Sequence, residues 1–91
     1  MRQAIQVGEL VWSLAGHDKG ESFLVIRREG EFLFLCDGKR RKATACKRKK
    51  EKHVSGSGLV CQWVATQPER VNNTSVRVAI KRLLAESGEV K

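Results

Sequence analysis

Short apolar runs separated by turn residues constrain the fold of this 91-residue chain most strongly. From residue 5 to residue 36 the runs are IQVGELVWSL, SFLVIRR and EFLFLC, with AGHDKGE and EG between them. Runs of this length, rich in β-branched and aromatic residues, are typical of strands. Glu29-Gly30 and Asp37-Gly38 are two-residue hairpin signals, because glycine tolerates the positive φ of tight turns. With residues 39–46, KRRKATAC, as a fourth strand, the sequence predicts an antiparallel meander.

The second and third predicted strands are apolar on both of their alternating faces, as the segments FLVI and FLFLC show. Strands of this kind are covered on both sides. We therefore expect a mainly β fold, a small closed antiparallel barrel with a helix laid over it.

A helix near the C-terminus provides this cover. Thr74 or Ser75 can cap its start, and Gly88 can end it. Apolar residues recur at three- and four-residue spacing, at Val76, Ala79, Ile80, Leu83 and Leu84. Basic residues fall on the opposite side, at Arg77, Lys81 and Arg82. The pattern favours an amphipathic helix that packs on the barrel over a helix for a membrane or a partner.

The segment between barrel and helix has two parts. Residues 55–58, SGSG, are interpreted as a flexible connector. Residues 59–65, LVCQWVA, fit either a further strand or an extended segment that covers the barrel. We divide the chain into residues 1–54, the barrel with its basic run, and residues 55–91, the linker, extended segment and helix of the same compact unit.

The length of the chain indicates one domain, too small for a large enclosed active site. The N-terminal segment MRQAIQVGELVW lacks the apolar core of a signal peptide. No apolar stretch approaches the ~20 residues needed to span a bilayer. We therefore expect a cytoplasmic protein without a membrane partner.

The cysteines Cys36, Cys46 and Cys61 are expected to be reduced thiols that are buried or half-buried. They lie ten and fifteen residues apart, whereas zinc sites use close pairs. No sequence signature links a cysteine to His17 or His53 as a nucleophilic pair. We expect no enzyme, no catalytic residue, no metal, no cofactor and no small-molecule substrate.

Positive charge is concentrated in residues 37–53, DGKRRKATACKRKKEKH. This stretch holds nine of the eighteen Lys and Arg and only two of the ten acids, so it carries seven of the eight net positive charges. Neutralised phosphates release counterions, so such a run favours nucleic acid as the partner. The alternatives are a solvated loop, a disordered tail or a membrane surface, but the run lacks the Trp, Phe and Leu of an interfacial helix.

The basic run consists of two clusters separated by residues 43–46, ATAC. If these residues form a strand, the clusters at residues 39–42 and 47–52 flank one sheet edge and face successive phosphates. Arg contributes bidentate contacts and Lys point charges. We expect the charges of Lys47, Arg48, Lys49 and Lys50 to lie peripheral to the apolar strands.

A second candidate site is AGHDKGES, residues 15–22. Gly16 and Gly20 permit a tight loop whose backbone amides approach phosphates, with His17 and Lys19 as donors. The spacing differs from that of a P-loop, which ends in Gly-Lys-Ser/Thr.

Aromatic stacking residues are scarce. Phe23, Phe32 and Phe34 are predicted to be core residues, which leaves Trp12 and Trp63 as the candidates for exposure. We therefore expect recognition of RNA shape and backbone more than of splayed single-stranded bases.

Residues 7–26, VGELVWSLAGHDKGESFLVI, resemble a KOW motif, in which an apolar strand, Gly-x-Asp-Lys-Gly and a second apolar strand follow one another. Gly20 stands at the characteristic glycine of that motif. The segments FLFLCDGKRR and KRKKEKHV extend the similarity to small bacterial KOW proteins related to archaeal and eukaryotic large-subunit ribosomal proteins. The similarity covers residues 5–54, and NNTSVRVAIKRLLAESG resembles their C-terminal helix, whereas VSGSGLVCQWVATQ has no counterpart.

The resemblance implies an SH3-like barrel that binds ribosomal RNA or is otherwise ribosome-associated in translation. The RNA-facing residues that it implies are Gly16, His17, Lys19 and Gly20 in the motif loop, and Lys39, Arg40, Arg41, Lys42, Lys47, Arg48, Lys49, Lys50, Lys52 and His53 in the basic run. Asp18 is expected to shape the loop. The expected protein is a monomer that binds large-subunit ribosomal RNA and ribosomal proteins.

Two other functions fit the same residues. One is a KOW module in transcription elongation that contacts RNA polymerase or nascent RNA. The other is a protein-interaction adaptor whose basic run meets an acidic partner.

Overall fold

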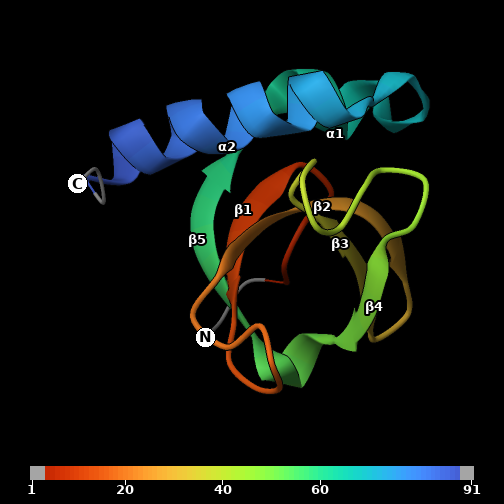
Figure 1. Ribbon diagram of the computed structural model, residues 1–91, viewed down its shortest axis with the longest axis vertical. Coiled ribbons are helices and arrows are strands. Elements are labelled where there is room, and N and C mark those ends of the chain that lie inside the picture. The colour runs from red at the N-terminus through yellow and green to blue at the C-terminus, as the bar shows by residue number, and fades with distance from the viewer. Residues whose placement is uncertain (1–3, 89–91) are drawn as a thin grey trace.

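Five antiparallel strands and a C-terminal helix make up the fold in the computed structural model, which describes residues 4–88 (Figure 1). The strands are β1 Glu9–Ser13, β2 Ser22–Glu29, β3 Phe32–Cys36, β4 Lys47–Lys50 and β5 Val54–Val60. The helices are α1 Gln62–Thr66 and α2 Asn73–Ser87, with two 3₁₀-helices, η1 Glu51–His53 and η2 Pro68–Arg70. The prediction of a mainly β fold with a C-terminal helix is confirmed.

The strands form one sheet in the order β4-β3-β2-β1-β5, and every neighbouring pair is antiparallel. The turn between β2 and β3 consists of Gly30 and Glu31, one residue later than the predicted Glu29-Gly30. The sheet curls in Figure 1, and η1 joins its edge strands, β4 and β5. No ladder pairs these two strands within residues 4–88. Closure into a barrel therefore stays a prediction.

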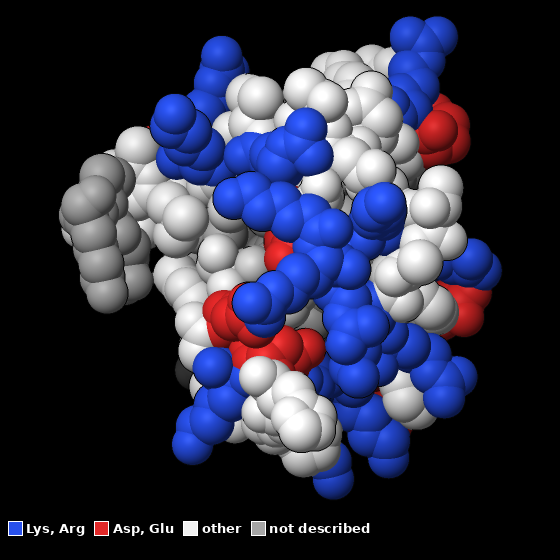
Figure 2. Space-filling view, viewed as in Figure 1, with Lys and Arg blue, Asp and Glu red and all other residues white. Residues whose placement is uncertain are grey.

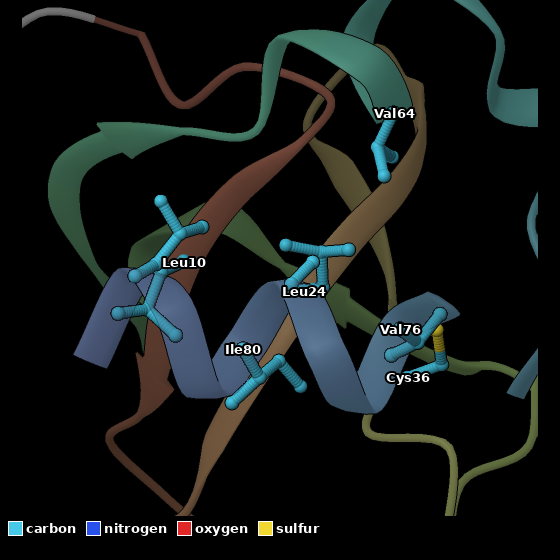
Figure 3. Packing of buried hydrophobic residues seen from close by; sticks show 8 residues of the cluster. Leu10, Leu24, Cys36, Val64, Val76 and Ile80 are labelled. Carbon is cyan, nitrogen blue, oxygen red and sulfur yellow. The ribbon is translucent and has the colours of Figure 1, made fainter. Parts of the chain in front are cut away.

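The apolar faces of the central strands are buried against different partners. Leu10 and Leu24 pack under α2 with Cys36, Val64, Val76, Ala79, Ile80 and Leu83 (Figure 3). On the opposite face a second cluster contains Ile5, Val11, Phe23, Val25, Leu33, Leu35 and Val54. Successive residues of a strand point to opposite faces of the sheet, so β2 contributes Leu24 to the first cluster and Phe23 and Val25 to the second. The prediction of a strand covered on both sides is thus confirmed for β2, whereas in β3 Phe32 and Phe34 are only half-buried and the prediction is wrong for this part of its outer face.

The apolar side of α2 lies across the sheet as predicted, with Val76, Ala79, Ile80 and Leu83 buried and Leu84 half-buried. Its basic residues Arg77, Lys81 and Arg82 are exposed. The N-cap is Asn72, not Thr74 or Ser75. The Asn72 side chain accepts from the Ser75 backbone N–H at 2.8 Å, and Ser75 completes a capping box. Gly88 ends the helix in the left-handed conformation, as predicted.

The predicted fourth strand is wrong in position. Residues 37–46 form a loop, and β4 starts only at Lys47, so Asp37-Gly38 is not a two-residue hairpin and residues 43–46 are not a strand. The Asp37 carboxylate accepts the backbone N–H groups of Lys39 and Arg41 at 2.8 and 2.9 Å. The Ala43 backbone N–H donates to the Asn73 side chain at 2.8 Å, which ties the loop to α2.

The interpretation of residues 55–58 as a flexible connector is also wrong, because they lie within β5, which pairs with β1. A Cβ atom on Gly56 would meet the carboxylate of the buried Glu9, so glycine at this position leaves room for that side chain. Residues 59–65 split between the end of β5 and α1, which the sequence did not predict.

A substitution at Gly38 tests how closely the loop of residues 37–46 packs on α2. Its φ is 78°, and a Cβ atom would lie 2.4 Å from the Asn73 backbone oxygen and 2.9 Å from Arg77 Cγ. We expect Gly38→Ala to lower the free energy of unfolding by about 2–4 kcal/mol, from backbone strain and the clash together. Gly30→Ala is the control, because Gly30 has φ 58° and open space around it. Equal losses in urea unfolding of the two variants would refute the docking argument.

Candidate nucleic-acid interface

The fold divides the basic run among the loop of residues 37–46, strand β4 and the 3₁₀-helix η1. Figure 2 shows Lys and Arg side chains gathered into a band that crosses this face of the molecule. Six of the predicted cations are exposed, namely Lys39, Arg40, Lys42, Arg48, Lys50 and Lys52, and His53 is exposed beside them. Arg41, Lys47 and Lys49 are partly buried. Most of the basic residues of the run are therefore exposed at the surface, but not all of them.

Strand β4 separates its four basic residues by alternation, so that Lys47 and Lys49 share one face and Arg48 and Lys50 the other. Lys49 Nζ lies 2.8 Å from Asp18 Oδ1, 2.6 Å from Ser13 Oγ and 2.8 Å from the Ala15 carbonyl oxygen. An ammonium group has three donors, and these contacts use all of them. We therefore exclude Lys49 from the interface, and the expectation that all of these charges are peripheral is wrong.

Asp18 is nine-tenths buried in this contact, as is the Lys49 side chain. Burial alone would raise the pKa of Asp18, but hydrogen bonds from Lys49 and Ser13 and the charge of Lys49 outweigh burial and lower the pKa below 3.8. The carboxylate is thus ionised at neutral pH and ties the loop of residues 14–21 to β4. Asp18 shapes the loop, as the sequence indicated.

The loop of residues 14–21 contains the predicted residues Gly16, His17, Lys19 and Gly20, all of them exposed. Gly16 and Gly20 have φ values of 83° and 87°. The Leu14 backbone N–H donates to the His53 carbonyl oxygen at 2.9 Å, so the loop lies beside η1. On its other side His17 and Asp18 line a small cavity of about 120 Å³ with Arg40 and Arg41. The two predicted sites are therefore neighbours in space.

Helix α2 adds cations that the sequence analysis did not assign to RNA. A groove of about 690 Å³ runs between this helix and the loops, lined by Gly20, Glu21, Ser22, Asp37, Lys39, Arg40, Arg77, Ile80, Lys81 and Leu84. Arg77 donates to the Gly38 carbonyl oxygen at 2.7 Å, which holds its guanidinium beside the loop. The four-residue spacing of Arg77 and Lys81 placed them on the polar helix face. This spacing did not predict that the loop of residues 37–46 packs beside Arg77.

The prediction that Phe32 and Phe34 are core residues is wrong. Only Phe23 is fully buried, whereas Phe32 and Phe34 are half-buried on the outer face of β3, because Leu33 and Leu35 occupy its inner positions. The Arg48 guanidinium lies 4.4 Å from the centre of the Phe32 ring, and that of Arg27 lies 5.3 Å from the centre of the Phe34 ring.

The two tryptophans differ in exposure. Trp12 is half-buried against the core under α2. Trp63 is 42% exposed on α1 and lines a separate hollow with Val78 and Arg82. Both tryptophans lie outside the segment of residues 37–53 that carries the basic run.

The cysteine thiols are free in the structure. Burial, with a smaller effect of the neighbouring Cys46 and Asp37, raises the pKa of Cys36 to about 12, and burial also raises the pKa of Cys46. Both thiols are thus protonated at neutral pH. Within residues 4–88 no group of three or more His, Cys, Asp or Glu is arranged to hold a metal ion.

No helix in the described part of the chain is both long and apolar enough to cross a bilayer. The sequence matches no model of a protein family, and no curated protein gives a significant match.

Lys49→Gln tests the buried contact. Removing the ammonium leaves the buried Asp18 carboxylate without its charged partner, and breaking such a pair costs about 3–5 kcal/mol. We expect a loss of about 3 kcal/mol in the free energy of unfolding at neutral pH, measured in urea. Lys52→Gln, at an exposed position of the same run, is the control and should stay within about 0.5 kcal/mol. Similar stability of the two variants would contradict the buried role.

The same pair has a characteristic pH dependence. Since the folded protein lowers the pKa of Asp18, this stabilisation is complete above about pH 4 and is lost as the pH falls through the lowered pKa. In the Lys49→Gln variant no ammonium group offsets the burial of the Asp18 carboxylate. Protonation of Asp18 then removes the unfavourable buried charge. We expect the stability deficit of the variant to shrink between about pH 7 and about pH 3, followed by urea unfolding. A constant deficit would show that Asp18 is not the group responsible.

Proposed function

We propose that this protein is a non-enzymatic RNA-binding protein whose sheet is an SH3-like barrel of the KOW type. The observation that carries the proposal is the cationic surface assembled from residues 14–21, residues 37–46, β4, η1 and α2. We call this the basic surface and define it by Lys19, Lys39, Arg40, Arg41, Lys42, Lys47, Arg48, Lys50, Lys52, Arg77 and Lys81. So many like charges on one small domain favour a polyanion as the partner.

The strand arrangement supports the barrel. Strands β1 to β4 lie beside one another in chain order, and β5 returns to the free edge of β1. The 3₁₀-helix η1 turns the chain directly from one edge strand into the other. The KOW-like segment of residues 7–26 contains β1, the loop that follows it and the first part of β2, and this loop lies in the basic surface.

The chemistry of the basic surface supports backbone contacts with RNA. Lys side chains bring mobile point charges to phosphates, and Arg side chains bind phosphate oxygens in pairs. Among residues 4–88, the acids that line the α2 groove are Glu21 and Asp37. Asp37 is engaged by backbone N–H groups of its own loop, and Glu21 lies 3.7 Å from the exposed Arg40. Such an exposed pair is weak, so Arg40 can exchange Glu21 for phosphate.

A ribosomal target in translation rests on the resemblance to ribosome-related KOW proteins. The test is sedimentation of a cell lysate through sucrose, with and without ribonuclease, at low and high salt. We expect the protein to migrate with the large subunit in moderate salt and to be released by ribonuclease. Its absence from ribosomal fractions would remove the ribosomal target, and co-migration that survives ribonuclease would indicate a protein partner.

Salt dependence tests RNA binding with purified protein. If about six phosphates are contacted, the logarithm of the binding constant should fall with the logarithm of salt concentration with a slope of about −4 to −6. We expect Lys39→Gln/Lys42→Gln to weaken binding and to reduce that slope by about 1.5. Arg70→Gln/Arg82→Gln removes two charges outside the basic surface and is the control. Equal effects of the two double variants would contradict the proposed surface.

A further inference from the structure

We propose that the outer face of β2, β3 and β4 is a stacking platform for single-stranded RNA. This inference rests on the proposed RNA binding and names the kind of RNA that is bound. The platform consists of Phe32 and Phe34 with the cations Arg27, Arg48 and Lys50. Of these five residues, only Arg48 and Lys50 belong to the basic run.

The register of the sheet builds the platform in two rows. Phe34 lies between Arg27 on β2 and Arg48 on β4, as directly paired residues. Phe32 lies in the same way between Glu29 and Lys50. Side chains of paired residues stand about 4.5–5.5 Å apart at their Cβ atoms, so each ring has a cation within reach. Each aromatic ring thus has at least one cation beside it on a partly exposed sheet face.

The cations lie over the rings and not merely beside them. Arg48 is 4.4 Å and Lys50 5.8 Å from the centre of the Phe32 ring, and Arg27 is 5.3 Å from that of Phe34. These cation–π distances orient the guanidinium groups before RNA arrives. RNA bases stack on aromatic rings and on Arg guanidinium planes alike. A base can therefore stack on the Phe32–Arg48 pair while a phosphate binds the adjacent ammonium of Lys50.

The acids on this face do not block phosphates. Arg27 pairs with Glu29, and Lys50 lies 3.3 Å from Glu31. All four side chains are about half exposed or more, at 65% and 50% for the first pair and 45% and 65% for the second. Exposed pairs of this kind contribute at most about 1 kcal/mol, so exchange for a phosphate is inexpensive.

The spacing of the two rings favours a single strand over a duplex. Residues two apart on a strand are separated by about 6.7 Å. Stacked bases in one strand of a duplex are separated by only about 3.4 Å. Neighbouring bases that stack on Phe32 and on Phe34 must therefore separate from one another, which a single strand allows and a duplex prevents, because the adjacent pairs cover the faces of its bases.

A groove beside Phe34 offers room for a base. Its volume is about 670 Å³, and its lining residues are Ile26, Arg27, Phe34, Ala43, Thr44, Ala45, Cys46, Pro68 and Glu69. Apolar side chains form much of it, and the exposed side chains of Arg27 and Thr44 add polar groups. Such groups bind the edges of unpaired bases by hydrogen bonds. The platform and groove together fit an unstacked nucleotide.

The test compares Phe32→Leu/Phe34→Leu with wild type in binding to a 12-nucleotide single-stranded RNA and to a 16-base-pair RNA duplex. Leucine keeps an apolar side chain on the strand but removes the ring. Stacking contributes about 1–3 kcal/mol per base, so we expect single-strand affinity to fall at least about 25-fold for two bases. Duplex affinity and the salt slope should change little. Trp63→Leu, which removes an exposed aromatic outside the platform, is the control and should bind as wild type.

A second variant tests the guanidinium without touching the rings. Arg48→Lys keeps the charge but loses the planar group, and we expect about fivefold weaker binding to the single strand with an unchanged salt slope. Arg40→Lys, the same change elsewhere on the basic surface, is its control. An Arg48→Lys effect no larger than that of Arg40→Lys would count against stacking on the guanidinium.

The outcomes separate this inference from the proposed function. Unchanged single-strand affinity of the double Phe variant, equal losses for single strand and duplex, or wild-type binding to duplex alone would each overturn the platform and leave RNA binding standing. Wild-type protein that binds neither RNA at low salt would overturn the proposed function itself. Thermal unfolding of the variants, with midpoints near that of wild type, ensures that lost affinity reports lost stacking.

Discussion

The contact between Lys49 and Asp18 is the interaction on which the basic surface depends. An ammonium and a carboxylate, each nine-tenths buried, are tolerated only because each has partners. Lys49 reaches from β4 to Asp18 and to Ser13 at the end of β1, so the edge strand and the loop of residues 14–21 are held in one arrangement. The cations of both segments are therefore presented together.

Because side chains alternate between the two faces of β4, the basic residues of this strand fall into two groups with different roles. Its sequence KRKK has no apolar residue, and its strand conformation comes from pairing with β3. Lysine-rich edge strands also resist pairing with other chains. Lys49 is used for structure, whereas Arg48 and Lys50 stand over the Phe32 ring on the solvent side. A net charge calculated from the sequence cannot distinguish these tasks.

Local signals predicted β1, β2, β3 and the apolar side of α2, because periodicity and turn residues act over a few neighbours. The failed predictions for residues 37–46 and 55–58 depended on distant partners. Gly38 packs on Asn73, which turns an expected hairpin into a docked loop, and Gly56 makes room for Glu9 within a strand. Phe32 was assigned to the core because every residue of FLFLC is apolar, so the sequence left open which face points inward. The sequence located the basic segments, but it did not show which of their charges are exposed and which are buried in contacts.

Register connects these observations. A slip of one residue in the pairing of β4 with β3 would move every β4 side chain to the other face. Lys49 would then leave Asp18 uncompensated, and Arg48 would leave the rings for the interior. The buried ion pair thus opposes the slip from one end of the strand. At the other end the loop of residues 37–46 is tied to α2 through Asn73 and Arg77, so the helix, although distant in sequence, helps to set the register of the cations on β4.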